Sequence, residues 1–311
     1  MSVVRFRKSG VPGCRDVSGA IRAGLQGRAQ GGRAIVVGGG KGGTGKSLIT
    51  ANLAVLASLR GRATVAVDAD LGLANLHLLL GIDPGADLSS LLEARRSAGA
   101  PGRDLLARGP AGVWLLPGAS GVARLAGLDR GELRRLVHRL EPHLREGEAV
   151  FFDLSSGLSP ATRLFLRAAH EIVIVANPEP TAVLDAYGVI KMLVEYGHSG
   201  RVHLVMNRVH DPQAADDCAR RIVGTAQQYL DRGVSFLGSV PEDEAVAASV
   251  ARRRPVVLDR PQAPAAAALR AIAQQLFVDA EPAADTLSAF FSTAKALLAP
   301  RSRTTRSSCA L

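Results

Sequence analysis

The sequence is poor in cysteine and has none in pairs. Its three cysteines, Cys14, Cys218 and Cys309, lie far from one another along the chain. Metal sites and redox centres of the C-x-x-C kind need two cysteines within a few residues, so the sequence excludes both kinds of site. Unpaired cysteines are also typical of proteins in a reducing compartment. We therefore expect a cytoplasmic protein.

Long apolar runs are missing as well. No stretch approaches the roughly 18 apolar residues that a membrane-spanning helix needs. Arg5, Arg7 and Lys8 near the N-terminus are not followed by the apolar segment of a secretory signal. We expect neither a membrane-spanning protein nor a secreted one.

Acidic residues are outnumbered, and the excess of positive charge lies at the two ends. The formal net charge is +10, and residues 1–33 hold seven Lys or Arg residues against one Asp. The tail adds Arg301, Arg303 and Arg306, which leaves the body between the two ends nearly neutral. This argues against a general nucleic-acid surface on the fold and favours flexible arms that meet anionic lipid, DNA or an acidic protein. A generally Arg-rich composition explains the same pattern without any partner.

Hydrophobic residues make up 47% of the 311 residues, which is enough for one large core with tails. Residues 1–33 show no sustained period and predict a flexible basic leader. Apolar runs separated by segments of helical period then predict a parallel sheet with helices on both faces. These runs are 34–38, 64–68, 113–116, 149–154, 172–176, 202–207 and 236–239. The sequence thus predicts a doubly wound α/β domain over 34–280 and a C-terminal segment over 281–311.

One octapeptide between the first apolar run and a helical segment has the form G-x-x-x-x-G-K-[ST]. Loops of this form wrap phosphates with backbone N–H groups, while the lysine reaches the β and γ oxygens and the hydroxyl binds Mg²⁺. A flexible Gly-rich linker is the alternative, and the order strand, loop, helix argues against it. We predict a site for ATP and Mg²⁺ with Ser47 as a metal ligand. The predicted nucleotide-binding residues here are Gly40, Lys41, Gly42, Gly43, Thr44, Gly45, Lys46, Ser47 and the following Leu48.

The loop has another lysine near its start, Lys41, in addition to Lys46. A nucleotide bound in the loop needs only Lys46. We expect Lys41 to point elsewhere, for instance to the phosphates of a facing subunit; an ordinary solvated charge is the alternative. The pattern K-G-G-x-G-K-[ST] resembles the deviant Walker A motif of the MinD/ParA ATPases. In that family this lysine reaches the partner's nucleotide in an ATP-bound homodimer. The resemblance implies catalytic roles for both Lys41 and Lys46.

Three carboxylates lie at or just after the carboxyl ends of two of the predicted strands, at the edge of a parallel sheet where ligands bind. Asp68 and Asp70 come after residues 64–67, and Asp153 comes after 149–152. An Asp after a strand is also a common helix cap. Phosphoryl transfer, however, needs a metal ligand and a group that orients water, and Asp153 suits the metal ligand, acting mainly through water. The family resemblance implies that Asp70 positions the attacking water and that Asp68 supports the metal shell.

Further segments are similar to the flagellar-number regulators, the FlhG/FleN branch of this family. Residues 178–191 match P-E-P-T-A-x-x-D-A-Y-x-x-I-K, and residues 68–81 look like the first switch of MinD-type proteins. The resemblance implies a P-loop NTPase fold of the SIMIBI type. It also implies that Gly157 senses the γ-phosphate and that Asn207, Arg208 and Pro241 lie at the adenine. The function it implies is an ATP-hydrolysing dimerisation switch that limits the number or position of a surface assembly such as flagella.

Departures from the family pattern fall in the loops around the phosphates. Gly39 stands before Gly40, Thr44 replaces a common valine, and Ser155 and Ser156 replace a Pro-Ala or Gly-Ala pair. We expect ATP binding to be kept and hydrolysis to be slow. The D-Q-A-x-x-L-R type of segment that engages an SRP-like GTPase in the flagellar branch is not found in residues 1–33. The partner stays open between that GTPase, a flagellar basal-body protein and another polar complex.

Residues 287–298 predict a second functional element, an amphipathic helix capped by Asp285. Together with the basic tail, such a helix can lie in an anionic membrane interface, as in the MinD family, here at the inner face of the cell membrane. A helix docked on its own domain shows the same apolar stripe, and the sequence leaves the two alternatives open. The apolar residues at helical spacing are Leu287, Phe290, Phe291, Ala294, Leu297 and Leu298.

Other members of the superfamily fit less well. A ParA-type partition ATPase binds DNA through cations on its folded body, whereas this body is nearly neutral. Nitrogenase-iron-protein and iron–sulfur carrier types need paired cysteines, the tandem arsenite-pump type needs a second phosphate loop, and the related tyrosine kinases carry a tyrosine-rich tail. The sequence has none of these features.

Overall fold

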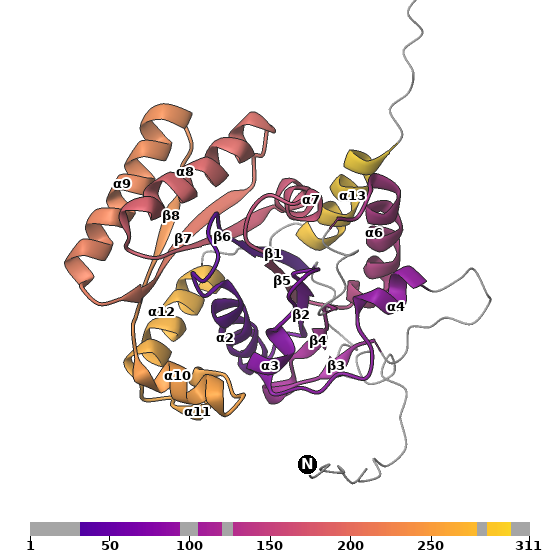
Figure 1. Ribbon diagram of the computed structural model, residues 1–311, viewed down its shortest axis with the longest axis horizontal. Coiled ribbons are helices and arrows are strands. Elements are labelled where there is room, and N and C mark those ends of the chain that lie inside the picture. Colours follow the sequence, from indigo (N-terminus) through magenta and orange to yellow (C-terminus); the bar gives the residue numbers. More distant parts are fainter. Residues whose placement is uncertain (1–31, 94–104, 120–126, 279–284, 300–311) are drawn as a thin grey trace, which may run out of the picture.

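A sheet of eight strands forms the centre of the computed structural model, which describes residues 32–93, 105–119, 127–278 and 285–299 (Figure 1). The strand order is β3-β4-β2-β5-β1-β6-β7-β8, and all neighbours are parallel except β3 and β4. Seven strands confirm the predicted ones within two residues at each end. The strands are β1 (Arg33–Gly38), β2 (Thr64–Ala69), β3 (Ala107–Arg108), β4 (Trp114–Leu116), β5 (Ala149–Leu154), β6 (Glu171–Ala176), β7 (Arg201–Val209) and β8 (Ser235–Pro241).

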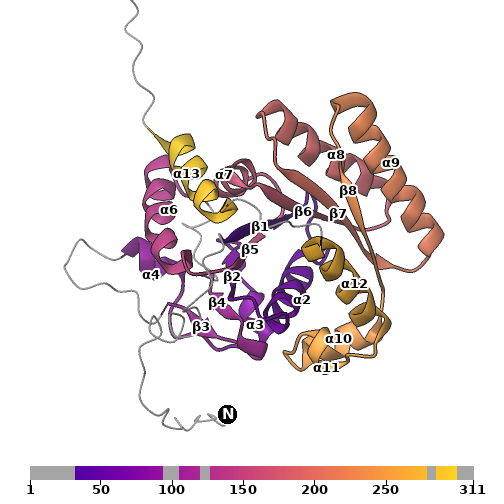
Figure 2. The same cartoon turned by 180° about the vertical axis from the view of Figure 1, so that it is seen from behind.

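Helices cover both faces of the sheet, as the continuous apolar strands predict (Figures 1 and 2). One face carries α2 (Lys46–Leu59), α3 (Leu76–Leu80), α10 (Glu244–Ala251), α11 (Val256–Asp259) and α12 (Pro264–Val278). The other carries α4 (Leu88–Glu93), α6 (Arg130–Leu144), α7 (Pro160–Ala168), α8 (Pro180–Glu195), α9 (Pro212–Leu230) and α13 (Thr286–Leu298). A short 3₁₀ turn, η1, spans Pro110–Gly112.

The two cores follow from the alternation of side chains along each strand. In β1, Ala34 and Val36 belong to the core under α6, α7 and α13, whereas Ile35 and Val37 belong to the core under α2 and α12. All six residues of β1 are buried, because helices pack on both sides of it.

Helix α13 lies in the outer layer of helices and packs with one face against β1, α6 and α7 (Figure 1). Its apolar stripe is buried except for Leu297, which is half-buried, and the ring of Phe290 stacks on that of Phe152 in β5 with 4.6 Å between centroids. Asp285 caps the helix as predicted, by accepting a hydrogen bond from the Ser288 N–H at 3.0 Å. Of the two alternatives for residues 287–298, the structure therefore shows the packing face and not a face toward a bilayer. The basic residues of the tail lie outside the described residues.

The described helices include none that combines the length and apolar character needed to cross a membrane.

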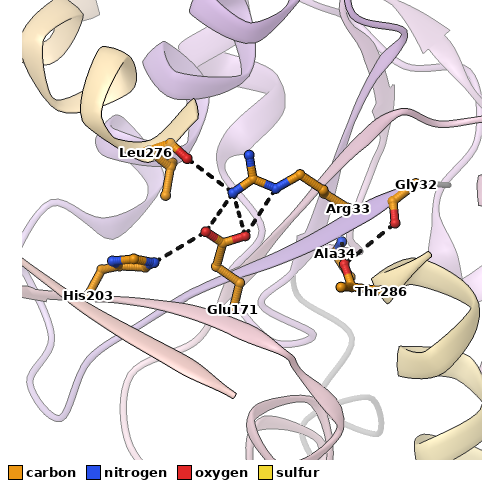
Figure 3. A network of polar contacts seen from close by, with 7 residues as sticks. All are labelled: Gly32, Arg33, Ala34, Glu171, His203, Leu276 and Thr286. Atoms are coloured by element: carbon orange, nitrogen blue, oxygen red, sulfur yellow. Dashed lines mark hydrogen bonds and ion pairs between the residues drawn. The ribbon is translucent and has the colours of Figure 1, made fainter. Parts of the chain in front are cut away.

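Arg33 is the first residue of β1, so the predicted boundary of the leader at residue 33 is wrong by one residue. The guanidinium of Arg33 is buried and pairs with Glu171 of β6 at 2.6 Å, while donating to the Leu276 carbonyl of α12 at 3.1 Å (Figure 3). His203 of β7 lies 3.2 Å from the same carboxylate. Burial alone would raise the pKa of Glu171, but the hydrogen bonds and charges of His203 and Arg33 lower it. Breaking a buried pair of this kind typically costs about 3–5 kcal/mol, so Arg33 belongs to the domain.

The same end of the sheet anchors α13. The Thr286 hydroxyl accepts a hydrogen bond from the Ala34 N–H at 3.2 Å (Figure 3). The Leu287 N–H donates to the Gly32 carbonyl at 2.8 Å. These bonds link the first turn of α13 to β1 and to the residue just before it.

Candidate nucleotide-binding site

The predicted phosphate loop connects the carboxyl end of β1 to α2. Gly43 and Gly45 adopt left-handed backbone conformations, with φ of 77° and 91°. Gly45 is the N-cap of α2, and no side chain caps the helix there. The first N–H groups of a 14-residue helix therefore point at the loop, which is the arrangement that favours bound phosphate.

Asn207 of β7 supports the shape of this loop. Its side-chain amide donates to the Thr44 carbonyl at 2.8 Å, and a Cβ atom added to Gly45 would lie only 2.2 Å from the amide nitrogen. Only glycine fits at that position. The bracing role of Asn207 escapes sequence analysis, because nothing in the sequence places β7 beside the loop. Its predicted contact with adenine stays a prediction.

Arg208 and Pro241 lie near Asn207 at the same end of the sheet. Arg208 has a left-handed φ of 57°, and its exposed guanidinium pairs with Glu242 at 3.0 Å. Pro241 ends β8 and is in register with Val209 of β7. The structure thus brings together the residues predicted for the adenine, and their contacts with the base stay predictions.

The two lysines of the loop behave differently. Lys46 is buried, and its Nζ donates to the Lys41 carbonyl at 3.0 Å; burial lowers its pKa. Lys41 is half-exposed, and its Nζ donates to Glu179, just before α8, at 2.6 Å. The hydrogen bond and charge of Glu179 raise the pKa of Lys41. Glu179 belongs to residues 178–191, the segment similar to the flagellar-number regulators. Only the fold shows that it is the partner of Lys41.

Asp68 and Asp153 stand side by side on the neighbouring strands β2 and β5. Both are fully buried. Burial, together with the charge of Asp153, raises the pKa of Asp68 to about 8, and burial raises the pKa of Asp153 to about 7. Hydrogen bonds from Ser47 and Thr50 partly oppose the rise at Asp153. The pair therefore holds a proton near neutral pH in the absence of a bound cation.

Asp68 also shapes the segment that follows β2. Its Oδ1 accepts from the Asp70 N–H at 3.2 Å, and its Oδ2 accepts from the Leu76 N–H at the start of α3 at 2.9 Å. Asp70 is partly exposed and accepts from the N–H groups of Gly72 and Leu73 at 3.3 and 3.1 Å. Asp70 is thus placed on a loop beside the buried pair, and Asp68 holds that loop in shape.

Gly157, the predicted γ-phosphate sensor, lies in the loop between β5 and α7 with a left-handed φ of 81°. The loop is tied to α7 by hydroxyl contacts. Thr162 Oγ1 lies 2.9 Å from both Ser155 Oγ and Ser159 Oγ, and Ser159 caps α7. These contacts connect the loop to the first turn of α7.

The residues present fit a nucleotide with Mg²⁺. Two buried polar atoms at the loop, Thr44 Oγ1 and Asp153 Oδ2, have no hydrogen-bond partner among the described residues. The described residues contain no group of three or more His, Cys, Asp or Glu side chains that could hold a metal alone. Mg²⁺ commonly uses one or two protein ligands together with phosphates and water, and Ser47 and Asp153 can supply these.

Comparison with known proteins identifies relatives over most of the chain. Residues 35–256 match the family described as the CobQ/CobB/MinD/ParA nucleotide binding domain. The antiactivator FleN of Pseudomonas aeruginosa is 33% identical over 242 residues, which are 78% of this chain and 85% of that protein. The flagellum site-determining protein YlxH of Helicobacter pylori is 28% identical over 221 residues, 71% and 73% of the two chains. The solved septum site-determining protein MinD of Pyrococcus horikoshii, complexed with Mg-ADP, is 27% identical with a TM-score of 0.63 and covers 79% of this chain and 96% of that one.

Proposed function

Because this chain belongs to the CobQ/CobB/MinD/ParA nucleotide-binding family, we propose that it is a Mg²⁺-dependent ATPase that dimerises when ATP is bound. The N–H groups of the loop and Lys46 bind the phosphates, while Ser47 and Asp153 hold the metal. Mg²⁺, when bound, neutralises charge on the β and γ oxygens. Asp70 orients the attacking water from the loop that Asp68 keeps in shape.

The observation that carries the dimer is the direction of Lys41. Its Nζ is paired with Glu179 at the surface, while Lys46 alone is buried in its own loop. This half-exposed cation lies at the front of the phosphate loop, and it can reach the nucleotide of a second copy by exchanging Glu179 for the phosphates. Three exposed leucines, Leu73, Leu158 and Leu184, lie on segments that follow β2, β5 and β6, at the same edge of the sheet as the loop. Burying them against a partner would add apolar contact to the charge interaction.

The ATPase rate per molecule tests this proposal as protein concentration is raised. A catalytic dimer predicts a rate that rises and then levels off, and Lys41→Ala should remove the rise while ATP still binds. A rate per molecule that is independent of concentration for the unaltered protein would exclude dimer-dependent hydrolysis.

We propose that the switch sets the number or position of flagella. The support is similarity to YlxH, whose name describes it as a flagellum site-determining protein, together with the resemblance of residues 178–191 to the flagellar-number regulators, the branch that contains the antiactivator FleN. An SRP-like GTPase or a basal-body protein is the partner that this role suggests. Disruption of the gene in its host should change the flagellar count in electron micrographs. Restoration by the unaltered gene but not by Lys46→Ala would link the count to nucleotide binding; an unchanged count would point to another polar complex.

Membrane association is proposed only for the ATP-bound form. The apolar side chains of α13 are buried in the core, so contact with a bilayer through them requires the helix to leave its site. Sedimentation with anionic liposomes should therefore show no binding without nucleotide. Binding that is equal with and without ATP would mean that α13 plays no part in it.

A further inference from the structure

A groove runs beside α13 on the face opposite α2 and α12. Its volume is about 390 Å³, and it is lined by residues at the start of α6, on one side of α7, just after α8 and at the end of α13. Leucines form its floor, namely Leu128, Leu133, Leu164, Leu297 and Leu298. All of these except Leu297 are buried, so the apolar surface lies at the bottom of the groove and does not protrude from it.

The rim of the groove is cationic. Arg163 and Arg167 project from α7 four residues apart, which places them on one side of the helix. Arg167 lies over the ring of Tyr196 at 4.4 Å, and its Nε is buried without a hydrogen-bond partner among the described residues. Arg130 donates to the carbonyl groups of Leu297 and Ala299 at 2.7 and 2.8 Å and so closes one end.

The one acidic side chain that the described residues place in the lining, that of Asp129, already forms a hydrogen bond at the start of α6. Asp129 accepts the Glu132 N–H at 2.7 Å in the capping box of α6. Within the described part of the chain, none of the three rim arginines forms an ion pair. The groove therefore combines an apolar floor with an excess of positive charge, since its described lining residues include three arginines against the single carboxylate of Asp129. Its complement is a ligand with carboxylates and an apolar side chain.

We propose that this groove binds a short acidic peptide segment of a partner protein, with a leucine-like side chain on the floor and carboxylates at Arg163 and Arg167. A lipid surface fits less well, because membrane insertion needs protruding apolar side chains and these leucines are recessed. The chain's own C-terminal tail carries Arg301, Arg303 and Arg306, so its charge repels the rim.

The groove is also connected to the nucleotide site, and this part rests on the proposed function. Thr162, next to Arg163, contacts Ser155 and Ser159 in the loop predicted to sense the γ-phosphate. A change in that loop on ATP binding moves the first turn of α7 and with it the rim. Peptide affinity should therefore depend on nucleotide.

Fluorescence anisotropy with a labelled peptide of sequence DLEDLLED tests the site in the full-length protein without nucleotide. The peptides KLKKLLKK and DSEDSSED control for charge and for the apolar side chains. Arg163→Glu should weaken binding of the acidic peptide by about fivefold or more, as reversal of a rim charge predicts. Arg134→Glu is the matched control, since Arg134 is an exposed arginine of α6 outside the groove, and it should leave the affinity nearly unchanged.

Several outcomes would overturn the proposal. These are no binding of the acidic peptide, equal binding of the basic or serine peptide, or equal weakening by Arg163→Glu and Arg134→Glu. Displacement of the peptide by phosphatidylglycerol liposomes in an Arg163-dependent way would assign the groove to lipid instead. A nucleotide-independent dimer that Arg163→Glu dissociates would assign it to a second copy of the chain. Peptide binding without any effect of ATP would keep the groove and remove only its link to the nucleotide switch.

Discussion

Replacing Phe290 with alanine tests whether α13 is docked in solution. Phe290 is 0% exposed, and its ring lies 4.6 Å from Phe152, 5.9 Å from Phe165 and 5.3 Å from Phe291, centroid to centroid. Removing a buried phenylalanine from a core typically costs about 3–5 kcal/mol. Because three aromatic contacts are lost together, we expect the upper half of that range, a large part of the roughly 5–15 kcal/mol that stabilises a typical domain.

Urea unfolding followed by circular dichroism and by the fluorescence of Trp114, the single tryptophan, measures this loss. Ser292→Ala is the control, because Ser292 is an exposed residue of the same helix, and its effect should stay within about 0.5 kcal/mol. A loss of less than about 1 kcal/mol for Phe290→Ala would refute the docked position, since a partly exposed ring would then be the better description. That result would favour the alternative in which the apolar face of residues 287–298 contacts a membrane.

Three further predictions concern the nucleotide site. Thr50→Val removes the hydroxyl that donates to Asp153 at 3.2 Å. Because this contact orients a metal ligand, calorimetry in the presence of ATP should show the affinity for Mg²⁺ falling by about tenfold or more. Thr50→Ser should keep the affinity, and an affinity of Thr50→Val equal to that of the unaltered protein would show that Asp153 needs no such support. Asp70→Ala should bind Mg-ATP normally and hydrolyse it poorly, because orienting water acts only in the transition state; turnover equal to the parent's would move that role to Asp68. In the nucleotide-free protein, the raised pKa values of Asp68 and Asp153 mean that the folded state holds protons more tightly than the unfolded state. The contribution of this pair to stability should therefore fall as pH rises from about 4, the ordinary carboxyl value, toward the raised values of about 7 and about 8. Thermal melts of Asp153→Asn should depend less on pH over that range than melts of the unaltered protein; an equal dependence would mean that the pair is not coupled to folding.

Features that depend on a local sequence pattern could be predicted from the sequence. Strands buried on both faces have continuous apolar runs, and this is why seven of the eight described strands lie close to their predicted bounds. The phosphate loop has a fixed spacing and was found for the same reason. β3 has only two residues, Ala107 and Arg108, and so carries no pattern to detect. The predicted end of the leader at residue 33 was wrong, because Arg33 has the charge of the basic leader. Its place in β1 becomes evident only when its buried partner, Glu171, is found beside it.

Contacts between distant segments could not be predicted. Glu179 pairs with Lys41 across 138 positions, Asn207 braces Thr44 across 163, and Thr50 meets Asp153 across 103. None of these pairs has a spacing signature, because the sheet topology brings them together. The amphipathic stripe of α13 shows the limit in another way. A face that packs on a protein core and a face that enters a bilayer need the same side chains, so only the fold distinguishes them.

The mass of the protein in solution, measured by light scattering with Mg-ATP, tests the central claim most directly. Asp70→Ala should trap the ATP-bound state and double its mass when ATP is added. The same variant carrying Lys41→Ala should bind ATP and keep the mass of a single chain, because the cation that reaches the second nucleotide is gone. A dimer that persists without Lys41, or an Asp70→Ala protein that stays a single chain with ATP bound, would contradict the account.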